Sequence, residues 1–579
     1  MALIEFRPLG VSVEVPHGSS LLDAARRARV RLEAPCNGGG TCGKCRVRLD
    51  PASRPRARII GRHELSAADL ESGWILLCNT LVEGDLTVDL PGGSERGLRI
   101  LEDGRSAELP LAPWLTKRYD PTWRRTDLVG GGRLLGSEDG DTAARSWGVA
   151  VDIGTTTLVV SLIDLCTGSA AGSASALNPQ AVHAQDVLSR VHLGSTAPGL
   201  ETLHGELMAE IDRLIGVLTT EARVPRRRIY EVVVAGNTCM LHLAARVSPE
   251  PLGRYPYTPT LSGDEYLPAA ALGLRVSRHG QVYFPPIVSG FVGADISAGI
   301  LSTGLATAAG LILFVDIGTN GEMVLARDGV LQATSTAAGP AFEGMNIACG
   351  MRAARGAIER CAIVDGEVVL TTIEDAEPVG LCGSGLLDAV AALVTHGVIE
   401  GSGRFTRNPG SLPPGLRERL NRRDDKPVFQ LAGQVYLTQR DIRQVQLAKA
   451  AVRAGIDTLL KRNGLEAQTV DRALIAGSFG YHLSTRSLVD IGLFPAAFDG
   501  KVEYVGNTAR TGAETLLTNG AARGTLAAQV ARVESVELAN DPQFSDGFIA
   551  AMAFPAPRPD DLAGGLPTEQ SLSLSLSLS

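Results

Sequence analysis

The tetrapeptide Asp-Ile-Gly-Thr occurs twice in this chain, and each copy stands between two apolar segments. Residues 146–168 read as a strand, a turn that begins at Asp152, and a second strand. Residues 311–329 repeat this order, with Asp316 in the place of Asp152. An internal repeat of this kind predicts two halves of similar fold that face each other.

Both turns have the chemistry of a phosphate-binding loop. An aspartate that ends a buried strand and is followed by Gly-Thr places a carboxylate beside backbone N–H groups and hydroxyls that can hold phosphate. One such turn carries little weight, because it can arise by chance and its aspartate can be purely structural. Two of them, together with VGADISAGI (292–300), LIAGSFG (474–480) and VGNTARTGA (505–513), favour a nucleotide site.

This ordered set resembles the superfamily of sugar kinases, heat-shock chaperones and actin (ASKHA), in which two ribonuclease-H-like halves clamp ATP and magnesium. The resemblance implies an α/β fold, with VGADISAGI and VGNTARTGA as connecting helices. It also implies that Asp152 and Asp316 hold Mg²⁺ against the β- and γ-phosphates, and that Asp295 orients the attacking water. The other nucleotide-binding residues it implies are Gly154, Thr155, Thr156 and Thr157 in the first phosphate loop, Gly318, Thr319, Asn320 and Gly321 in the second, and Gly477, Ser478, Phe479 and Gly480 in the adenosine loop.

A second feature is the cysteine loop CNGGGTCGKC at residues 36–45. Zinc sites usually combine two C-x2-C pairs, whereas [2Fe–2S] ferredoxins place three ligands in one loop and the fourth on a distant strand. The spacing C-x5-C-x2-C resembles the adrenal-type variant of these ferredoxins. The glycines would let the backbone fold around the cluster and aim N–H groups at its sulfurs. We therefore expect a [2Fe–2S] cluster on Cys36, Cys42, Cys45 and Cys78, with zinc and plain core cysteines as the alternatives.

The residues around this loop predict a compact α+β unit like a ferredoxin domain. Residues 2–15 alternate as two strands, a helix follows with Ser19 or Ser20 as its N-cap, and further strands lie at CRVRLD, WILLCNT and DLTVDLP. The segment 93–145 is rich in Gly, Pro and charge, which predicts a linker. The expected domains are a [2Fe–2S] domain at 1–92, a linker at 93–145, ribonuclease-H-like halves at 146–307 and 308–555, and a disordered tail at 556–579.

The whole chain apart from the tail resembles the reductive activators of corrinoid proteins. The stretches that carry this resemblance are CNGGGTCGKC, VDIGTTTLVV, LNPQAVHAQDVLSR, VVVAGNTCMLHL, FVDIGTNGEM, AAGPAFEG, GLCGSGLLD, LTQRDIRQVQLAKAA and IAGSFG. One departure stands after GNT-x-M, where two adjacent histidines are expected and this chain has Leu241 and His242. We interpret His242 as a packed core histidine.

The resemblance implies an ATP-dependent repair reaction that returns a corrinoid protein stalled as Co(II) to Co(I), as in an O-demethylase or other methyl-transfer system. The electron would come from a donor such as a ferredoxin or a flavoprotein reductase and pass through the N-terminal cluster. Ferredoxin clusters have reduction potentials of about −400 mV. The Co(II)/Co(I) potential lies below the potential that such a cluster comfortably reaches. If the difference is about 100 mV, transfer of one electron costs about 2.3 kcal/mol, and the free energy of ATP binding or hydrolysis exceeds this cost.

Three other functions use parts of the same pattern. A small-molecule kinase of the ASKHA superfamily would have the same loops but would not need the cysteine loop. An ATP-dependent dehydratase activator also combines this fold with iron–sulfur chemistry, but its cluster bridges a dimer. An actin-like scaffold with an attached redox sensor would form filaments and turn over ATP slowly.

Composition and charge limit the partners and the cellular compartment that we expect for the protein. The net charge of −8 gives no reason to expect nucleic acid as a partner, and neither a secretory signal nor an apolar run long enough for a membrane span is visible. Nine cysteines without a disulfide pattern favour the cytoplasm. The nucleotide-binding fold leaves surface free for a homodimer.

Several residues have two interpretations. The scattered cysteines are expected to be small buried hydrophobes: Cys166, Cys239, Cys349, Cys361 and Cys382. The loop GLCGSGLLD (380–388) either lines the nucleotide cleft or only packs closely. Arg443 and Lys449 would lie near the adenosine loop, although helix charges are more often solvated. The basic residues between Arg26 and Arg62 form either a docking face for an acidic redox partner or an ordinary solvated surface.

Overall fold

The computed structural model describes residues 1–28, 30, 43–60, 65, 67–90, 109–477, 484–538 and 541–556. The chain divides into two compact units. Unit 1 combines residues 1–340, 455–478 and 500–544, and unit 2 combines residues 341–454, 479–499 and 545–579. Every helix in the described part is too short or too polar to serve as a membrane span.

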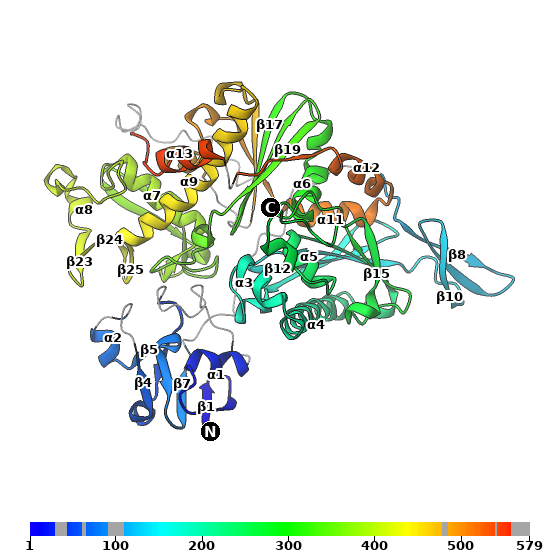
Figure 1. The fold of residues 1–579 in the computed structure, drawn as a ribbon, viewed down its shortest axis with the longest axis horizontal. Helices are drawn as coiled ribbons and strands as arrows, with labels where there is room; N and C mark the ends of the chain where they lie inside the picture. Colours follow the sequence, from blue (N-terminus) through cyan, green and yellow to red (C-terminus); the bar gives the residue numbers. More distant parts are fainter. Residues whose placement is uncertain are drawn as a thin grey trace. The chain divides into compact units, whose positions relative to one another are not determined.

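The N-terminal domain has the expected α+β architecture, with a mixed five-stranded sheet (Figure 1). Its elements are β1 (Ala2–Arg7), β2 (Val11–Val15), α1 (Leu21–Arg27), β3 (Arg46–Leu49), β4 (Ala57–Ile59), α2 (Ala67–Glu71), β5 (Trp74–Leu76), β6 (Thr80–Val82) and β7 (Leu86–Asp89). The strand order is β2-β1-β7-β3-β5, with β1 and β7 parallel, and β4 pairs separately with β6. Ser20 caps α1 by accepting a hydrogen bond from the Asp23 N–H at 3.0 Å, which confirms one of the two predicted caps.

The sequence predicts a linker at residues 93–145, but residues 115–139 of this range are folded. Strands β8 (Leu115–Asp120), β9 (Arg125–Gly130) and β10 (Arg133–Asp139) form an antiparallel sheet in the order β10-β9-β8. The expectation of a linker is therefore corrected for this sheet, whereas residues 91–108 lie outside the described part. The sheet packs its Leu115 and Leu128 against Tyr230. Because Tyr230 comes from a distant strand, local composition could not reveal this small core.

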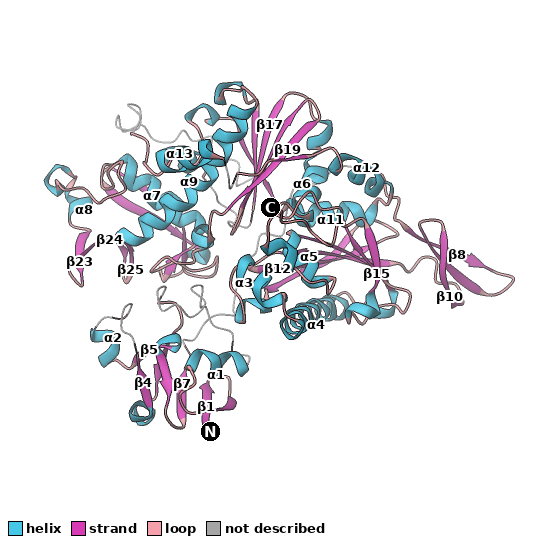
Figure 2. Ribbon diagram, in the orientation of Figure 1, coloured by secondary structure: helices cyan, strands magenta, loops and turns pink. Residues whose placement is uncertain are grey.

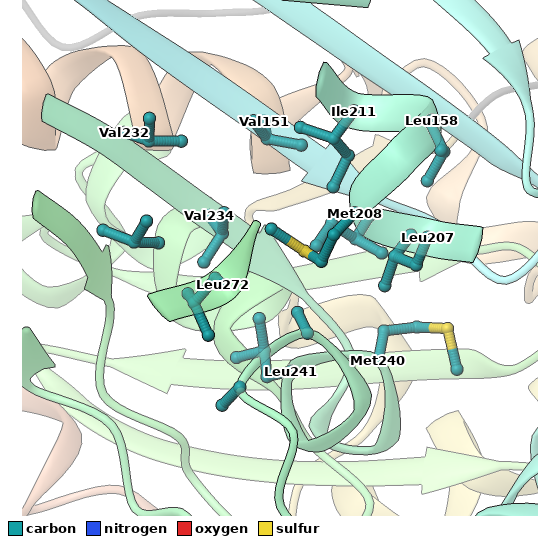
Figure 3. Packing of buried hydrophobic residues seen from close by; sticks show 14 of the residues in the cluster. Val151, Leu158, Leu207, Met208, Ile211, Val232, Val234, Met240, Leu241 and Leu272 are labelled. Carbon is teal, nitrogen blue, oxygen red and sulfur yellow. The ribbon is translucent and has the colours of Figure 1, made fainter. Parts of the chain in front are cut away.

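The first ribonuclease-H-like half contains a six-stranded sheet. Its elements are β11 (Trp147–Ile153), β12 (Thr157–Asp164), β13 (Ala170–Leu177), α3 (Val187–Gly194), α4 (Ala197–Glu221), β14 (Ile229–Gly236), α5 (Thr238–Ala244), β15 (Glu265–Pro268), β16 (Gln281–Phe284) and α6 (Ala294–Thr303). The strand order is β13-β12-β11-β14-β16-β15, and β11, β14 and β16 are parallel. Figure 3 shows Ile211 of α4 beside Val151 of the sheet and Met208 beside Val234, in a core cluster that also contains Leu207 and Val232. The amphipathic α4 and the fully buried β14 agree with the sequence pattern.

The second half repeats five strands of this sheet, as the two Asp-Ile-Gly-Thr turns predict, and adds its sixth strand at the opposite edge (Figure 2). Its elements are β17 (Leu311–Ile317), β18 (Gly321–Arg327), β19 (Val330–Thr336), β26 (Arg472–Ala476), β27 (Val502–Gly506), α11 (Thr508–Thr518), α12 (Ala521–Val530) and β28 (Glu534–Ser535). The strand order is β27-β26-β17-β18-β19-β28, with β17, β26 and β27 parallel. The expected connecting helices are α6 and α11, which pack so closely that a Cβ on Gly512 would lie 2.3 Å from the Ala298 carbonyl oxygen.

Unit 2 interrupts the second half between β19 and β26 and again between β26 and β27. The elements in and around it are β20 (Ala357–Val364), β21 (Glu367–Thr372), β22 (Gly380–Leu381), α7 (Gly383–Thr395), α8 (Pro414–Arg417), β23 (Leu420–Arg423), β24 (Lys426–Ala432), β25 (Val435–Thr438), α9 (Gln439–Arg462), α10 (Thr485–Asp490) and α13 (Pro542–Ala550). The strands form two small sheets, β21-β20-β22 and β23-β24-β25. The range expected for the second half therefore contains more than the duplicated sheet.

Candidate functional site

Four acidic side chains from both halves lie near one another in unit 1. Asp152 and Asp316 occupy the next-to-last positions of β11 and β17, and Asp295 lies in the first turn of α6. Glu322 on β18 is the direct strand partner of Asp316. These strand ends are the carboxyl ends of parallel strands, where open α/β sheets bind their ligands. The structure thus brings together the three predicted aspartates and adds Glu322.

The surroundings of these carboxyls make ionisation costly. Burial raises the pKa of Asp152 to about 6, and burial together with the Asp152 charge raises that of Asp295 to about 7. Burial, Asp295 and Asp152 raise the pKa of Asp316 to about 8, and burial, Asp295 and Asp316 raise that of Glu322. A cation would relieve this repulsion and displace the protons.

The arrangement suits a cation that arrives with its own ligands. In the part of the chain that the structure describes, no three His, Cys, Asp or Glu side chains are placed to ligate one metal ion together. Mg²⁺ commonly takes one or two carboxylates and completes its octahedron with waters and substrate phosphates. As whole residues, Asp152 and Asp316 are partly exposed, so this end of the two strands is not sealed from solvent.

Asn507 fixes the first of these carboxyls. It follows β27 and caps α11, because its Oδ1 accepts a hydrogen bond from the Arg510 N–H at 2.9 Å. Its Nδ2 donates to Asp152 Oδ2 at 2.8 Å, which lowers the pKa of Asp152 against the effect of burial. The motif VGNTARTGA predicts the helix, but nothing in its local pattern points to this bond.

The first phosphate loop, Gly154 to Thr156, is held by two asparagines. Asn178 Nδ2 donates to the Gly154 carbonyl at 2.9 Å, and the Asn178 N–H donates to the Thr156 carbonyl at 2.9 Å. Asn237, which caps α5, donates from Nδ2 to Thr155 Oγ1 at 3.1 Å. Thr157, also predicted for this loop, begins β12. Both asparagines belong to stretches that carry the family resemblance, but the sequence assigned them no role.

The second phosphate loop contains Gly318, Thr319 and Asn320, and the predicted Gly321 begins β18. The Gly318 N–H donates to the Asn320 carbonyl at 2.8 Å, which closes the turn. A Cβ on Gly318 would meet no protein atom closer than 3.9 Å, and Gly318 is not among the glycines with positive φ. The protein itself therefore does not require glycine there, whereas a phosphate approaching the backbone would. This cradle fits the predicted nucleotide.

The adenosine loop is described only at its start. Gly477 follows β26 with φ +131°, and its carbonyl accepts a hydrogen bond from Tyr504 Oη at 2.7 Å. Ser478, Phe479 and Gly480 lie outside the described residues, so the prediction for them stays a prediction.

Two of the four predicted cluster cysteines lie in the described part of the N-terminal domain. The Sγ atoms of Cys45 and Cys78 are 3.4 Å apart, which exceeds the roughly 2.05 Å of a disulfide and fits two thiolate ligands of one metal centre. The Leu77 N–H donates to the Cys45 carbonyl at 3.0 Å and holds the two segments together. Cys78 lies in a 3-10 turn between β5 and β6, which corrects the expectation of a strand. Cys36 and Cys42 lie outside the described residues.

The scattered cysteines are buried as expected in three cases: Cys239, Cys361 and Cys382. Cys349 is only partly buried, and Cys166 is exposed, so the prediction is wrong for Cys166. Cys166 lies in the turn after β12, where the apolar strand pattern has already ended. His242 is fully buried, with Nδ1 2.7 Å from the Thr238 carbonyl and Nε2 near the Thr260 and Leu261 N–H groups, which confirms a core histidine.

In unit 2, the glycines of GLCGSGLLD are packed closely. A Cβ on Gly385 would lie 2.0 Å from the Ile358 carbonyl oxygen, and one on Gly380 would lie 2.6 Å from Met351 Sδ. These contacts support the packing interpretation of the loop.

The two helix charges on α9 differ. Arg443 is exposed, as expected, but Lys449 is buried, and its Nζ donates to the Ala553 carbonyl beside the Phe554 ring. Burial lowers the pKa of Lys449 to about 7. The expectation of a solvated lysine is therefore wrong, because the chain returns from a distant segment to cover it.

Comparison with known proteins agrees with this architecture. Residues 4–83 match the 2Fe-2S iron-sulfur cluster binding domain, residues 147–308 match the RACo middle region, and residues 310–562 match the C-terminal domain of RACo, the ASKHA domain. Corrinoid activation enzyme RamQ of Eubacterium limosum is 29% identical, covering 95% of this chain and 98% of its own length. The [Co(II) methylated amine-specific corrinoid protein] reductase of Methanosarcina barkeri is 24% identical, covering 62% of this chain and 68% of its own length.

A solved structure extends this match to the fold. The reductive activator for corrinoid, iron-sulfur protein is 31% identical, with a TM-score of 0.72, covering 96% of this chain and 99% of its own. That match spans the residues of this chain that match the cluster domain, the middle region and the ASKHA domain. The chain therefore belongs to the family of reductive activators of corrinoid proteins.

Proposed function

We propose that this protein is an ATP-dependent reductive activator, which passes one electron to the Co(II) form of a corrinoid protein and so restores Co(I). The observation that carries this proposal is the near full-length match to proteins named as corrinoid activators. A small-molecule kinase would share the nucleotide loops but would have no use for the N-terminal cluster domain.

The cluster cysteines define the electron path. Cys45 and Cys78 fit thiolate ligands by their 3.4 Å separation, and Cys36 and Cys42 complete the proposed ligand set. A [2Fe–2S] cluster supplies a one-electron carrier when bound. The electron would come from a donor, such as a ferredoxin or a flavoprotein reductase, and its acceptor would be the cobalt of the partner protein.

The carboxyls and loops of unit 1 define the nucleotide site. Asp152 and Asp316 would take Mg²⁺ with the phosphates of ATP, while the backbone of both loops binds phosphate oxygens. Asp295, in the first turn of α6, would orient the water that attacks the γ-phosphate. The adenosine loop Gly477 to Gly480 would hold the base and ribose.

The proposed reaction also implies a target protein and a cellular compartment. The target is a corrinoid protein in its Co(II) state, and a homodimer is compatible with the fold. We place the protein in the cytoplasm, because the seven cysteines that the structure describes form no disulfide with one another, as a reducing compartment favours.

The proposal is tested anaerobically by the cobalt spectrum. Cluster-loaded protein and a reductant are mixed with a Co(II) corrinoid protein from the same source, with and without MgATP. Co(I) should appear only with MgATP and should be lost in Cys78→Ser and Asp316→Asn, while the matched variants Cys166→Ser and Asp328→Asn stay active. If MgATP has no effect on cobalt and phosphate appears on a small molecule instead, the protein is a kinase.

A further inference from the structure

Arg190 is a buried side chain that contacts the first phosphate loop from behind. It lies on α3, is fully inaccessible to solvent, and donates from Nη2 to the Thr155 carbonyl at 2.6 Å. Its Nε donates to the Ala184 carbonyl at 3.0 Å. Its Nη1 lies 3.1 Å from Gln180 Oε1 and 3.0 Å from Met240 Sδ. The planar guanidinium therefore spans the loop, the turn that follows β13, and helix α5.

The acceptors of Arg190 are themselves fixed. Gln180 Nε2 donates to the Leu203 carbonyl of α4 at 3.0 Å, so its Oε1 is turned toward Arg190. Asn178, two positions earlier, binds the carbonyls of Gly154 and Thr156. Arg190 and Asn178 together hold three successive loop carbonyls, those of Gly154, Thr155 and Thr156.

This arrangement determines where the loop N–H groups point. In a trans peptide the carbonyl and the following N–H point in opposite directions. With the Gly154 and Thr155 carbonyls held by Asn178 and Arg190, the N–H groups of Thr155 and Thr156 face away from this scaffold. Two successive N–H groups on one side form a concave anion site. The guanidinium adds a fixed positive charge, which acts strongly at low local dielectric.

We infer that Arg190 is a positioning residue of the nucleotide site: it holds the Thr155 carbonyl so that the loop N–H groups meet the phosphates of ATP. This inference rests on the proposed nucleotide binding. Arg190 does not touch the nucleotide, and its effect is specific for the phosphates. A lysine retains the charge but not the fork that reaches Thr155 and Gln180 together.

The test measures binding of MgATP and adenosine to the full chain, with thermal unfolding recorded without ligand. Arg190→Met should weaken MgATP binding at least about tenfold, because the Thr155 carbonyl would lose its charged hydrogen-bond donor. Arg190→Lys should recover part of this loss, and adenosine should bind all three proteins alike. Arg523→Met is the matched control, because Arg523 is a similarly buried arginine that binds Glu231 and the Leu516 carbonyl. It should lower stability without weakening MgATP binding more than adenosine binding.

Two other results would contradict the role of Arg190 or the proposed nucleotide site. If Arg190→Lys or Arg190→Met binds MgATP within twofold of the wild type, or if adenosine binding falls equally, Arg190 has no positioning role for phosphate. If the wild type binds no MgATP, the proposed nucleotide site fails and the inference fails with it.

Discussion

Replacing Asp316 by asparagine should stabilise the magnesium-free protein while destroying its response to MgATP. The folded protein holds the Asp316 proton up to a pKa of about 8, whereas the unfolded chain releases it at about 3.9. Between these values the folded state binds more protons. The stability that depends on this proton is therefore complete below about pH 4 and is lost as the pH rises to about 8.

The size of the effect follows from the same two pKa values. At about 1.4 kcal/mol per pKa unit, the ionisation of Asp316 alone would cost about 3 kcal/mol between pH 5.5 and pH 8. The repulsion is shared with Asp152, Asp295 and Glu322, so removing one carboxyl also lowers the pKa of the others. We therefore expect the stability of the variant relative to the wild type to rise by about 3 kcal/mol between pH 5.5 and pH 8, or about 6–12 °C in the midpoint of the first unfolding transition.

Thermal unfolding at both pH values, without magnesium and with saturating MgATP, measures both effects. A ligand at about one hundred times its Kd stabilises the wild type by about 2.7 kcal/mol, and Asp316→Asn should lose this gain. Asp328→Asn is the control, because Asp328 is exposed beyond the other end of β18. An unfolding midpoint of Asp316→Asn at or below that of the wild type, at pH 8 without magnesium, would refute this expectation.

Three further predictions concern other parts of the chain. Gly318→Ala should weaken MgATP binding about tenfold at an unchanged unfolding midpoint, because its Cβ would fill the phosphate cradle. Gly205→Ala, on the exposed face of α4, should bind normally and gain about 0.5–1 kcal/mol; equal binding by both variants contradicts the cradle. Cys78→Ser should lose the visible absorption of the cluster and Cys166→Ser should keep it, so a full spectrum in Cys78→Ser would remove Cys78 from the ligand set. Burial raises the pKa of Asp388 to about 6, so its contribution to stability is lost as the pH rises from about 4 to 6. Asp388→Asn should recover at most about 3 kcal/mol at pH 7.5 and nothing at pH 4, which a pH series of unfolding midpoints would show or disprove.

The parts of the fold predicted correctly depend on short-range patterns. The Asp-Ile-Gly-Thr turns, the Ser20 cap and the apolar face of α4 each involve residues within a few turns of chain. The errors involve partners far away in sequence. The sheet β8–β10 needs Tyr230 for its core, and Lys449 is covered by Ala553.

A usable signal for Lys449 was nevertheless present in α9. Ile442, Val445, Val452 and Ile456 recur at helical spacing and are all buried, and Lys449 continues their stripe. A charge within an apolar stripe indicates a buried partner more strongly than a solvated side chain. Periodicity should therefore take precedence over residue type at such a position.

The asparagines of the two Gly-Asn-Thr turns show why the site itself could be predicted only in part. Asn237 binds Thr155 within the first half, but Asn507 belongs to the second half and binds Asp152 of the first. The first carboxyl is thus oriented by the other copy of the fold, across 355 positions of sequence. A motion that separated the halves would break this bond, raise the pKa of Asp152 and weaken its hold on a cation. Because linkage is reciprocal, a cation bound at Asp152 must in turn favour the arrangement in which the Asn507 bond is intact.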